Sequence, residues 1–358
     1  MSEVIPIIIK ILFVFSCFLS LAAFLTWMER KQSALMQDRI GANRADILGF
    51  RAIGLFHIIA DSLKMFLKED FVPRRGHKFL HTFAPFISAF CAMAVFLVIP
   101  FGDVLKIGDK VYKLQIADIN VALLLLLAFM SYGIYGVFFA GISSHNKYGL
   151  LGGLRGAAQM LSYEVIMGIS LVGMVMISGS LSLREIVLSQ NKLLFGFLPA
   201  WGIFLQPLAF ILFLTAGMAE TKRTPFDLPE GESEIIGYFI EYSSMKFGLF
   251  FLTDFIEVIV VSALLTVFFF GGWNIPYLTQ SGFHFPWGWE IALSPIVVTI
   301  LQVVAFWFKV FFFCWVQLAI RWTLPRFRYD QLMGTTWKML LPLAIFNVLI
   351  TGLFILIF

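Results

Sequence analysis

The sequence has few charged residues and many apolar ones. Only 13% of its 358 residues are charged and 60% are hydrophobic, whereas soluble domains carry roughly 25% charged residues. A soluble fold of this length could not bury so much apolar surface, which excludes a soluble globular protein and indicates that the chain lies in a bilayer. The basic residues are scattered among apolar runs, so we expect no nucleic-acid partner.

Cysteine and histidine are also scarce. Cys17, Cys91 and Cys314 stand alone in separate apolar runs, whereas iron–sulfur clusters need closely spaced thiolates. None of the five histidines lies deep in an apolar run, which argues against a haem bundle. His77 and His81 are four residues apart, but no third metal ligand is near them in the sequence. We therefore predict no metal site, no redox centre and no bound cofactor in this chain.

Long apolar runs dominate what remains. A helix needs roughly 20 mostly apolar residues to cross the hydrocarbon core. We predict an all-α, polytopic membrane protein of about eight transmembrane helices, with residues 1–358 forming a single membrane domain. The predicted spans are 4–28, 79–101, 119–142, 157–178, 196–219, 244–271, 291–320 and 337–358.

The loops differ in positive charge. Of the 26 Lys and Arg residues, 17 lie in the odd-numbered connections and five lie in the even-numbered ones. Because Lys and Arg favour the cytoplasmic side of short loops, we predict cytoplasmic odd-numbered loops and both termini outside. In the first of these loops, apolar residues recur at helical spacing from Ile53 to Glu69 while Asp61, Lys64 and Lys68 can reach polar surroundings. This pattern predicts an amphipathic helix along the inner interface.

A few ionisable residues fall inside predicted spans, where a charge costs on the order of 3 kcal/mol and usually marks an ion or substrate path. Glu164 lies in the fourth span, Asp254 and Glu257 in the sixth, and Lys309 in the seventh. Asp254 and Glu257 are three residues apart and so share a helix face. The alternatives are an interfacial position for the carboxylates and a structural counter-ion role for Lys309.

The densest acidic segment is the predicted inner loop between the fifth and sixth spans, where residues 219–241 hold six acids and two bases. Crowded carboxylates raise one another's pKa and can titrate as a coupled group, which would suit proton handling. The alternative is a solvated acidic loop. Phe226 and Leu228 interleave with the acids, and a purely solvated loop would not need them.

Several sequence blocks point to a known family. Residues 219–234 read Ala-Glu-Thr-Lys-Arg-Thr-Pro-Phe-Asp-Leu-Pro-Glu-Gly-Glu-Ser-Glu, and Glu241-Tyr242 follows. Other blocks are Glu29-Arg30-Lys31, Ala60-Asp61-Ser62-Leu63-Lys64, Leu154-Arg155, Ser162-Tyr163-Glu164-Val165 and the segment 325–338. From about residue 27 to 342, these blocks resemble the H-type membrane subunit, the mitochondrial subunit 1 type, of respiratory complex I, the proton-pumping NADH-quinone oxidoreductase.

The resemblance implies a function that this composition permits. Such a subunit forms the quinone chamber and entry tunnel where the membrane and peripheral arms meet, and links quinone reduction to proton translocation through buried carboxylates. Quinone would be the substrate, and FMN and iron–sulfur clusters would belong to partner subunits. The partners would be peripheral-arm quinone-site subunits, small membrane subunits and lipid. The location would be the bacterial inner membrane, or the mitochondrial inner membrane if the chain is organellar.

Site residues follow from the matching motifs. The resemblance implies quinone-chamber or tunnel roles for Glu29, Arg30, Asp61, Arg155, Arg223 and Asp227. It implies proton-conducting roles for Glu164, Glu220, Glu230, Glu232, Glu234, Glu241 and Asp254. Asp254 stands where Glu is usual in the family.

Two departures from the family pattern affect the site. The usual Gly-Pro-Asn is Gly41-Ala42-Asn43, and the stretch that follows is longer and reads His57-Ile58 where Gln-Pro is common, so we expect a differently shaped tunnel mouth. The segment between Glu234 and Glu241 is one residue shorter than usual. On a helix this would turn Glu241 by ~100°, unless the loss of a π-bulge compensates.

Two other functions are compatible with parts of the pattern. A membrane subunit of an energy-converting hydrogenase, or of another donor-quinone dehydrogenase, would share several of these blocks. A stand-alone secondary transporter would tend to show inverted repeats with broken helices, and no matching pair of halves is visible in the sequence.

Overall fold

The computed structural model describes residues 4–107, 110–194, 196–231, 234–235 and 237–357. In this described part, seven helical segments are long and apolar enough to cross a membrane, which confirms a polytopic all-α membrane protein. They are α1 (Val4–Met36), α3 (Lys78–Ala94, extended by a 3₁₀ turn to Leu97), α4 (Ala122–Ser143), α5 (Lys147–Ser178), α9 (Ser244–Phe269), α10 (Pro295–Thr323), and α11 (Tyr329–Thr335) continued through a π-helical turn (Thr336–Leu340) into α12 (Leu341–Ile357).

The predicted fifth span is not one continuous helix. Residues 202–220 form a short helix, α7 (Gly202–Leu205), and a second apolar helix, α8 (Pro207–Glu220), separated at Gln206, which has φ −138° and ψ 59°. Pro207 begins α8 and has no N–H to continue a preceding helix. With 14 residues, α8 is about 21 Å long and is shorter than the hydrocarbon core.

Two spanning helices extend well beyond their apolar runs. α1 continues to Met36 instead of ending at residue 28, and α5 begins at Lys147 instead of residue 157. The polar residues in these extensions are compatible with a helix, although an apolar run cannot include them. Asn146 caps α5, because its side-chain oxygen accepts a hydrogen bond from the Tyr148 N–H at 3.0 Å. Glu29 and Arg155 therefore lie on continuous helices.

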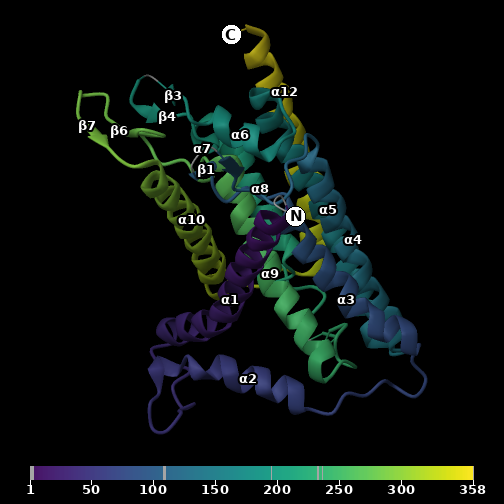
Figure 1. The fold of residues 1–358 in the computed structure, drawn as a ribbon. Helices are drawn as coiled ribbons and strands as arrows, with labels where there is room; N and C mark the ends of the chain where they lie inside the picture. Colours follow the sequence, from purple (N-terminus) through teal and green to yellow (C-terminus); the bar gives the residue numbers. More distant parts are fainter. Residues whose placement is uncertain (1–3, 108–109, 195, 232–233, 236, 358) are drawn as a thin grey trace.

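The amphipathic helix is present as α2 (Phe56–Leu67), which lies across the lower end of the bundle beside α1 and α9 (Figure 1). Its predicted start was too early, because Ile53 has a φ of +56° and belongs to a 3₁₀ turn before the helix. Apolar side chains of α2 such as Ile59, Leu63 and Phe66 are exposed in the isolated chain, as expected for an interfacial helix.

Short hairpins, which the sequence analysis did not predict, lie at the opposite end from α2 (Figure 1). β1 (Val104–Ile107) pairs antiparallel with β2 (Lys110–Lys113), with Leu105 opposite Tyr112. β3 (Leu193–Leu194) pairs with β4 (Leu198–Pro199), and α6 (Leu183–Ser189) precedes them. β5 (Leu278–Thr279), β6 (Gly282–His284) and β7 (Glu290–Ala292) form a three-stranded sheet. Strands this short do not show the alternation of apolar and polar residues by which a strand is recognised in a sequence.

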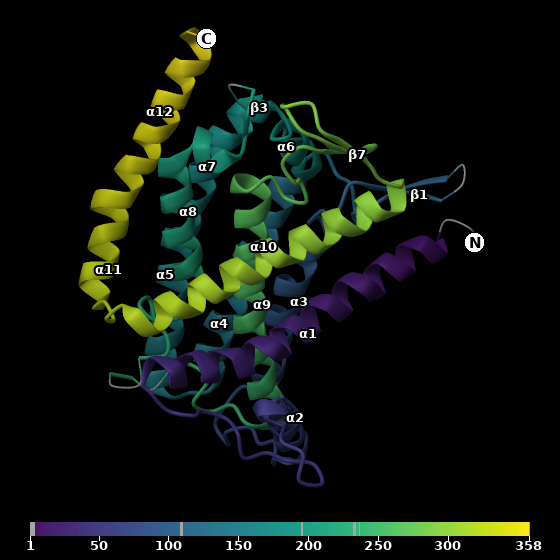
Figure 2. The ribbon, with the colours of Figure 1, turned by 90° about the vertical axis from the view of Figure 1, so that its left-hand side faces the viewer.

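Both termini lie at the hairpin end. The Lys10 ammonium near the start of α1 donates to the carbonyls of Lys113, at 3.3 Å, and Gln115, at 2.8 Å, beside β2. In Figure 2, α12 rises to the C-terminus at the end of the bundle opposite α2.

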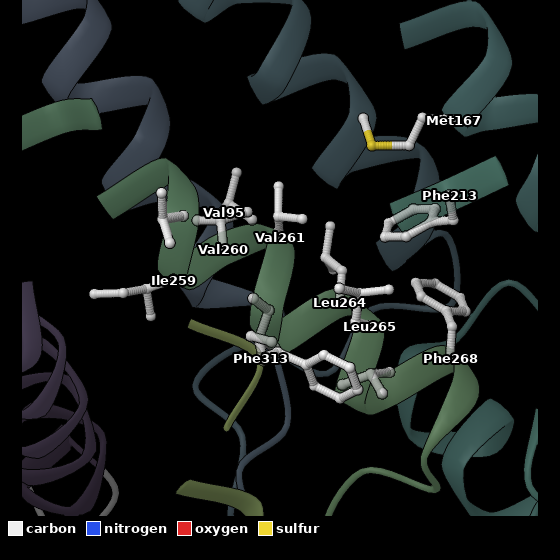
Figure 3. Packing of buried hydrophobic residues seen from close by; sticks show 14 of the residues in the cluster. Val95, Met167, Phe213, Ile259, Val260, Val261, Leu264, Leu265, Phe268 and Phe313 are labelled. Carbon is white, nitrogen blue, oxygen red and sulfur yellow. The ribbon is translucent and has the colours of Figure 1, made fainter. Parts of the chain in front are cut away.

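α9 is the central helix of the bundle and packs against α1, α2, α3, α8 and α10. Every residue from Val258 to Phe269 is buried, and most of them are apolar, as expected of a helix enclosed by others. Figure 3 shows Phe213 of α8 and Phe313 of α10 beside Val261, Leu264, Leu265 and Phe268 of α9. Small residues allow close approach: a Cβ at Gly217 of α8 would lie 2.5 Å from Cγ1 of Val261.

Lys309 fixes the C-terminal end of α9. Its ammonium donates to the backbone carbonyls of Phe270, Gly272 and Asn274 at 2.8, 2.9 and 2.7 Å. It also lies 4.7 Å from the ring centre of Trp201. Because carbonyl groups at a helix end attract a cation, this geometry favours the structural role for Lys309.

Candidate functional site

Glu29 joins three parts of the chain near the end of α1. Its Oε2 accepts a hydrogen bond from Arg223 at 2.8 Å, and its Oε1 lies 2.8 Å from Nη1 of Arg321, near the end of α10. The Arg223 guanidinium also lies 3.9 Å from the ring centre of Phe255 in α9. The sequence predicted Glu29 and Arg223 as site residues but missed Arg321, which stands in an ordinary last helical turn.

Arg30 and Asp61 form a second charged group, which ties α1 to α2. Arg30 donates to Asp61 Oδ2, and the Lys64 ammonium lies 3.4 Å from Asp61 Oδ1. Both residues line a cavity of about 330 Å³ between α1, α2 and α9. Its walls are otherwise largely apolar and include Met65 and Gly248.

A second cavity, of about 400 Å³, shares Arg30 with the first and is lined by polar groups that include Glu29, Arg39 and His57. Ala42 also lines it, so the stretch that departs from the family pattern borders this cavity. Within that stretch, the His57 ring nitrogen Nε2 accepts a hydrogen bond from the Ala45 N–H at 3.3 Å.

Arg155 and Glu234 form a third charged group, which ties α5 to the acidic loop. Arg155 Nη1 donates to Glu234 Oε2 at 2.6 Å, and its guanidinium lies 5.6 Å from the ring centre of Tyr329. The hydrogen bond from Arg155 lowers the pKa of Glu234 below its usual value. The expectation that crowding raises the pKa of the carboxylates in this loop does not hold for Glu234.

The fourth group is a buried cluster around Lys222, whose side chain is 1% exposed. Its ammonium lies 3.1 Å from Glu257 Oε2 and 3.3 Å from Asp254 Oδ1. Burial alone would lower the pKa of Lys222, but Glu257, Tyr238 and Asp254 together raise it well above its usual value, so the ammonium stays charged. From the sequence, Lys222 was only a basic residue of the loop, and Glu257 only shared a helix face with Asp254. Nothing indicated that Lys222 and Glu257 form an ion pair.

Glu230 extends this cluster. Burial, followed by the charges of Asp254 and Asp227, raises the pKa of Glu230 to about 8. The expectation of a raised pKa is therefore confirmed for Glu230. Glu220, at the end of α8, is 2% exposed, and Gln159 of α5 donates to the adjacent Ala219 carbonyl at 2.6 Å. Three predicted carboxylates, Glu220, Glu230 and Asp254, are thus gathered around one ammonium.

The remaining predicted residues have other surroundings. Glu164 accepts a hydrogen bond from Ser131 across the α4–α5 contact, and Glu241 accepts one from Asn146 Nδ2 at 2.9 Å. Residues 238–241 form a turn and not a helix, so the expected helical rotation of Glu241 does not apply. Asp227 lies near Glu230, whereas Glu232 lies outside the described residues.

The geometry defines a class of protein: a polytopic helical membrane protein with a cavity between its helices, charged residues in the wall of that cavity, and a buried cluster of ionisable groups around Lys222. In the described part of the chain, no three His, Cys, Asp or Glu side chains are placed to hold a metal ion. Residues 9–352 match the NADH dehydrogenase family.

Curated relatives indicate which subunit of such a complex the chain resembles. An H-type subunit of the NADH-quinone oxidoreductase of Cytophaga hutchinsonii is 43% identical over 96% of this chain and 95% of the relative. The H-type subunit of Thermomicrobium roseum is 45% identical over 94% and 92%, and one from Geobacter metallireducens is 45% identical over 96% and 94%. The chain belongs to this H-type family of complex I subunits. It is therefore a membrane subunit of an oxidoreductase complex, and other subunits of the complex are its partners.

Proposed function

We propose that this subunit forms the chamber and entry tunnel for the quinone substrate and links quinone reduction to proton translocation. The cavity of about 330 Å³ between α1, α2 and α9 carries the proposal. A quinone has a long apolar tail and a headgroup with two carbonyl oxygens. Largely apolar walls suit the tail, and the charged pair Arg30–Asp61 in the wall can orient the headgroup.

The link to protons follows from two consecutive residues. Arg223 binds Glu29, which lines the cavity of about 400 Å³. Lys222 instead faces Asp254 and Glu257 in the buried cluster. Reduction of a quinone to a quinol consumes two electrons and two protons. When groups of the chamber supply these protons, the chamber near Glu29 and Arg30 is left more negative. A shift of Arg223 in response would move Lys222 with it, because one peptide bond joins them, and would change which carboxylates hold protons.

The other parts of the proposal concern the surroundings. FMN and iron–sulfur clusters in partner subunits would supply the electrons, and this chain would bind no cofactor itself. The subunit would lie in the inner membrane with α2 at the cytoplasmic interface, both termini outside, and lipid against its exposed apolar helix faces. Peripheral-arm subunits would cover the cavity of about 400 Å³ that Glu29 lines, and small membrane subunits would pack beside the bundle.

Filling the cavity tests this function. Gly248 of α9 faces Met65 of α2, and a Cβ added at Gly248 would lie 3.5 Å from Met65 Cγ. The indole of Gly248→Trp would therefore occupy the tunnel. We expect the KM for long-tailed quinones to rise at least about tenfold, with a much smaller change for short-tailed quinones. NADH oxidation by isolated membranes with each quinone measures this.

A lipid-facing substitution is the matched control. Phe308 of α10 is 69% exposed in the isolated chain, and Phe308→Trp should leave both KM values unchanged. Electron transfer from NADH to ferricyanide confirms that each variant complex is assembled. Equal KM values for long-tailed quinones in the Gly248→Trp and unmodified complexes would contradict the tunnel.

A further inference from the structure

The buried cluster holds more carboxylates than its lysine can neutralise. Asp254 and Glu257 both contact Lys222, and Glu220 and Glu230 lie within range of its charge. Arg223, the neighbouring cation, is engaged by Glu29. Because an uncompensated buried carboxylate is costly, the members of this set must share protons among themselves.

The contacts of Lys222 single out Glu257. The ammonium donates a hydrogen bond to Glu257 Oε1 at 3.3 Å. It lies at ion-pair distance from Asp254 Oδ1 and from Glu257 Oε2, in both cases without hydrogen-bond geometry. Glu257 Oε2 is buried and, among the described residues, accepts no hydrogen bond. Glu257 Oε1 therefore accepts a hydrogen bond from the lysine. Oε2, although 3.1 Å from the same ammonium, accepts none from the described residues and can bind or release a proton.

A small cavity lies beside Glu257. It has a volume of about 20 Å³ and is lined by Glu220, Glu257 and Ser88 together with apolar residues of α3, α4, α5 and α9. A water molecule needs about 10–15 Å³ and two to four polar partners. Glu220 Oε2, Glu257 Oε2 and Ser88 Oγ are all buried, and none has a hydrogen-bond partner within the described part of the chain. The cavity thus has room and partners for one water.

We propose that Glu257 is a further proton-carrying residue, connected to Glu220 by one water molecule that Ser88 orients. This inference rests on the proposed function, because it adds a residue to the proton path. The protonated Glu220 gives its proton to the water while the water gives one of its own to the Glu257 carboxylate. The net result is the transfer of one proton from Glu220 to Glu257. Glu220 becomes a carboxylate, Glu257 becomes a carboxylic acid, and no hydronium or hydroxide ion is released. The Lys222 ammonium, placed between Glu257 and Asp254, favours the ionised form of whichever carboxylate it approaches.

The test uses the whole complex in membrane vesicles. Glu257→Gln keeps the size of the side chain but cannot carry a proton. We expect quinone-coupled proton pumping to fall about tenfold or more, electron transfer to ferricyanide to stay normal, and Glu257→Asp to restore a substantial part of the pumping. Ser262→Ala, on the same helix but outside the cavity, is the matched control and should pump normally.

Ser88→Ala separates a proton relay from a structural ion pair and also serves if Glu257→Gln fails to assemble. It leaves Lys222 and Glu257 paired and removes one partner of the water, so a relay predicts a several-fold loss of pumping. A counter-ion role for Glu257 predicts no loss. Redox-induced infrared difference spectra should contain a carboxylic-acid carbonyl band that shifts in D₂O and is missing in Glu257→Gln.

Two results would overturn the inference. One is normal pumping in assembled Glu257→Gln. The other is normal pumping in Ser88→Ala together with an infrared spectrum that Glu257→Gln leaves unchanged. If Gly248→Trp still discriminates against long-tailed quinones in either case, the proposed function stands and only the role of Glu257 falls. If Gly248→Trp has no effect, the quinone function itself is wrong.

Discussion

Glu29→Gln is expected to reduce quinone-coupled turnover about a hundredfold, because it misplaces groups that would hold the headgroup. Each carboxylate oxygen of Glu29 meets one arginine, Arg223 or Arg321, at 2.8 Å. A glutamine offers a single acceptor oxygen and would turn its NH₂ group toward the second guanidinium. Breaking such a buried pair costs about 3–5 kcal/mol, and Arg223 would leave its position beside the cavity. The measurement is NADH oxidation with a long-tailed quinone by membranes containing the assembled complex.

The same chemical change at an exposed position provides the control. Glu185 lies in the first turn of α6, at the hairpin end of the molecule, and Glu185→Gln should keep full activity. The ferricyanide rate should be normal in both variants, because electrons reach ferricyanide without the quinone chamber. A fully active Glu29→Gln complex would show that this cluster does not position the quinone.

Glu230→Gln is expected to remove a loss of activity at alkaline pH. Burial and the nearby Asp254 and Asp227 raise the pKa of Glu230 to about 8, so the group is protonated near pH 7 and ionises as the pH rises through 8. The stabilisation that comes with a raised carboxyl pKa is fully present below the ordinary pKa of 4.5 and is lost as the pH rises through the raised value. The ionised group would then repel Asp254 and loosen the loop from α9. Turnover should fall severalfold between about pH 7 and pH 9, and less in Glu230→Gln.

Asp254→Asn offers a second arm with a defined direction. It removes the negative charge that ionised Glu230 would repel, so the alkaline loss should be smaller in Asp254→Asn, as in Glu230→Gln. A profile that is identical in the unmodified, Glu230→Gln and Asp254→Asn complexes would show that Glu230 does not titrate in this range.

The membrane class and most of the spans could be predicted from composition, because a run of apolar residues has few uses outside a bilayer. The prediction of a continuous fifth span was wrong, because the break at Gln206 and Pro207 leaves the apolar character of the run unchanged. The predicted end of α1 and the predicted start of α5 were also wrong. Polar residues at these positions interrupt the apolar run, although they are compatible with a helix. The hairpins were missed because their strands have two to four residues.

The charged residues were easier to identify than to pair. Glu220, Glu230 and Asp254 could be identified from the sequence, and in the structure they lie near one another. Nothing in the sequence indicated, however, that Lys222 contacts both Asp254 and Glu257. Glu29 and Arg321 are far apart in the chain, and their contact depends on how α1 and α10 cross. The expected crowding effect failed at Glu234 because Arg155 of α5 donates a hydrogen bond to it.

The central claim is that quinone enters between α1, α2 and α9, and photoaffinity labelling tests it most directly. A long-tailed quinone carrying a photoreactive group in its tail is irradiated with the whole complex, and the labelled peptides are sequenced. We expect label in residues 58–66 and 245–252, which line the cavity together with α1, and loss of that label with excess unmodified quinone or with Gly248→Trp. Label confined to residues 291–358, or label that neither treatment reduces, would contradict the proposed tunnel.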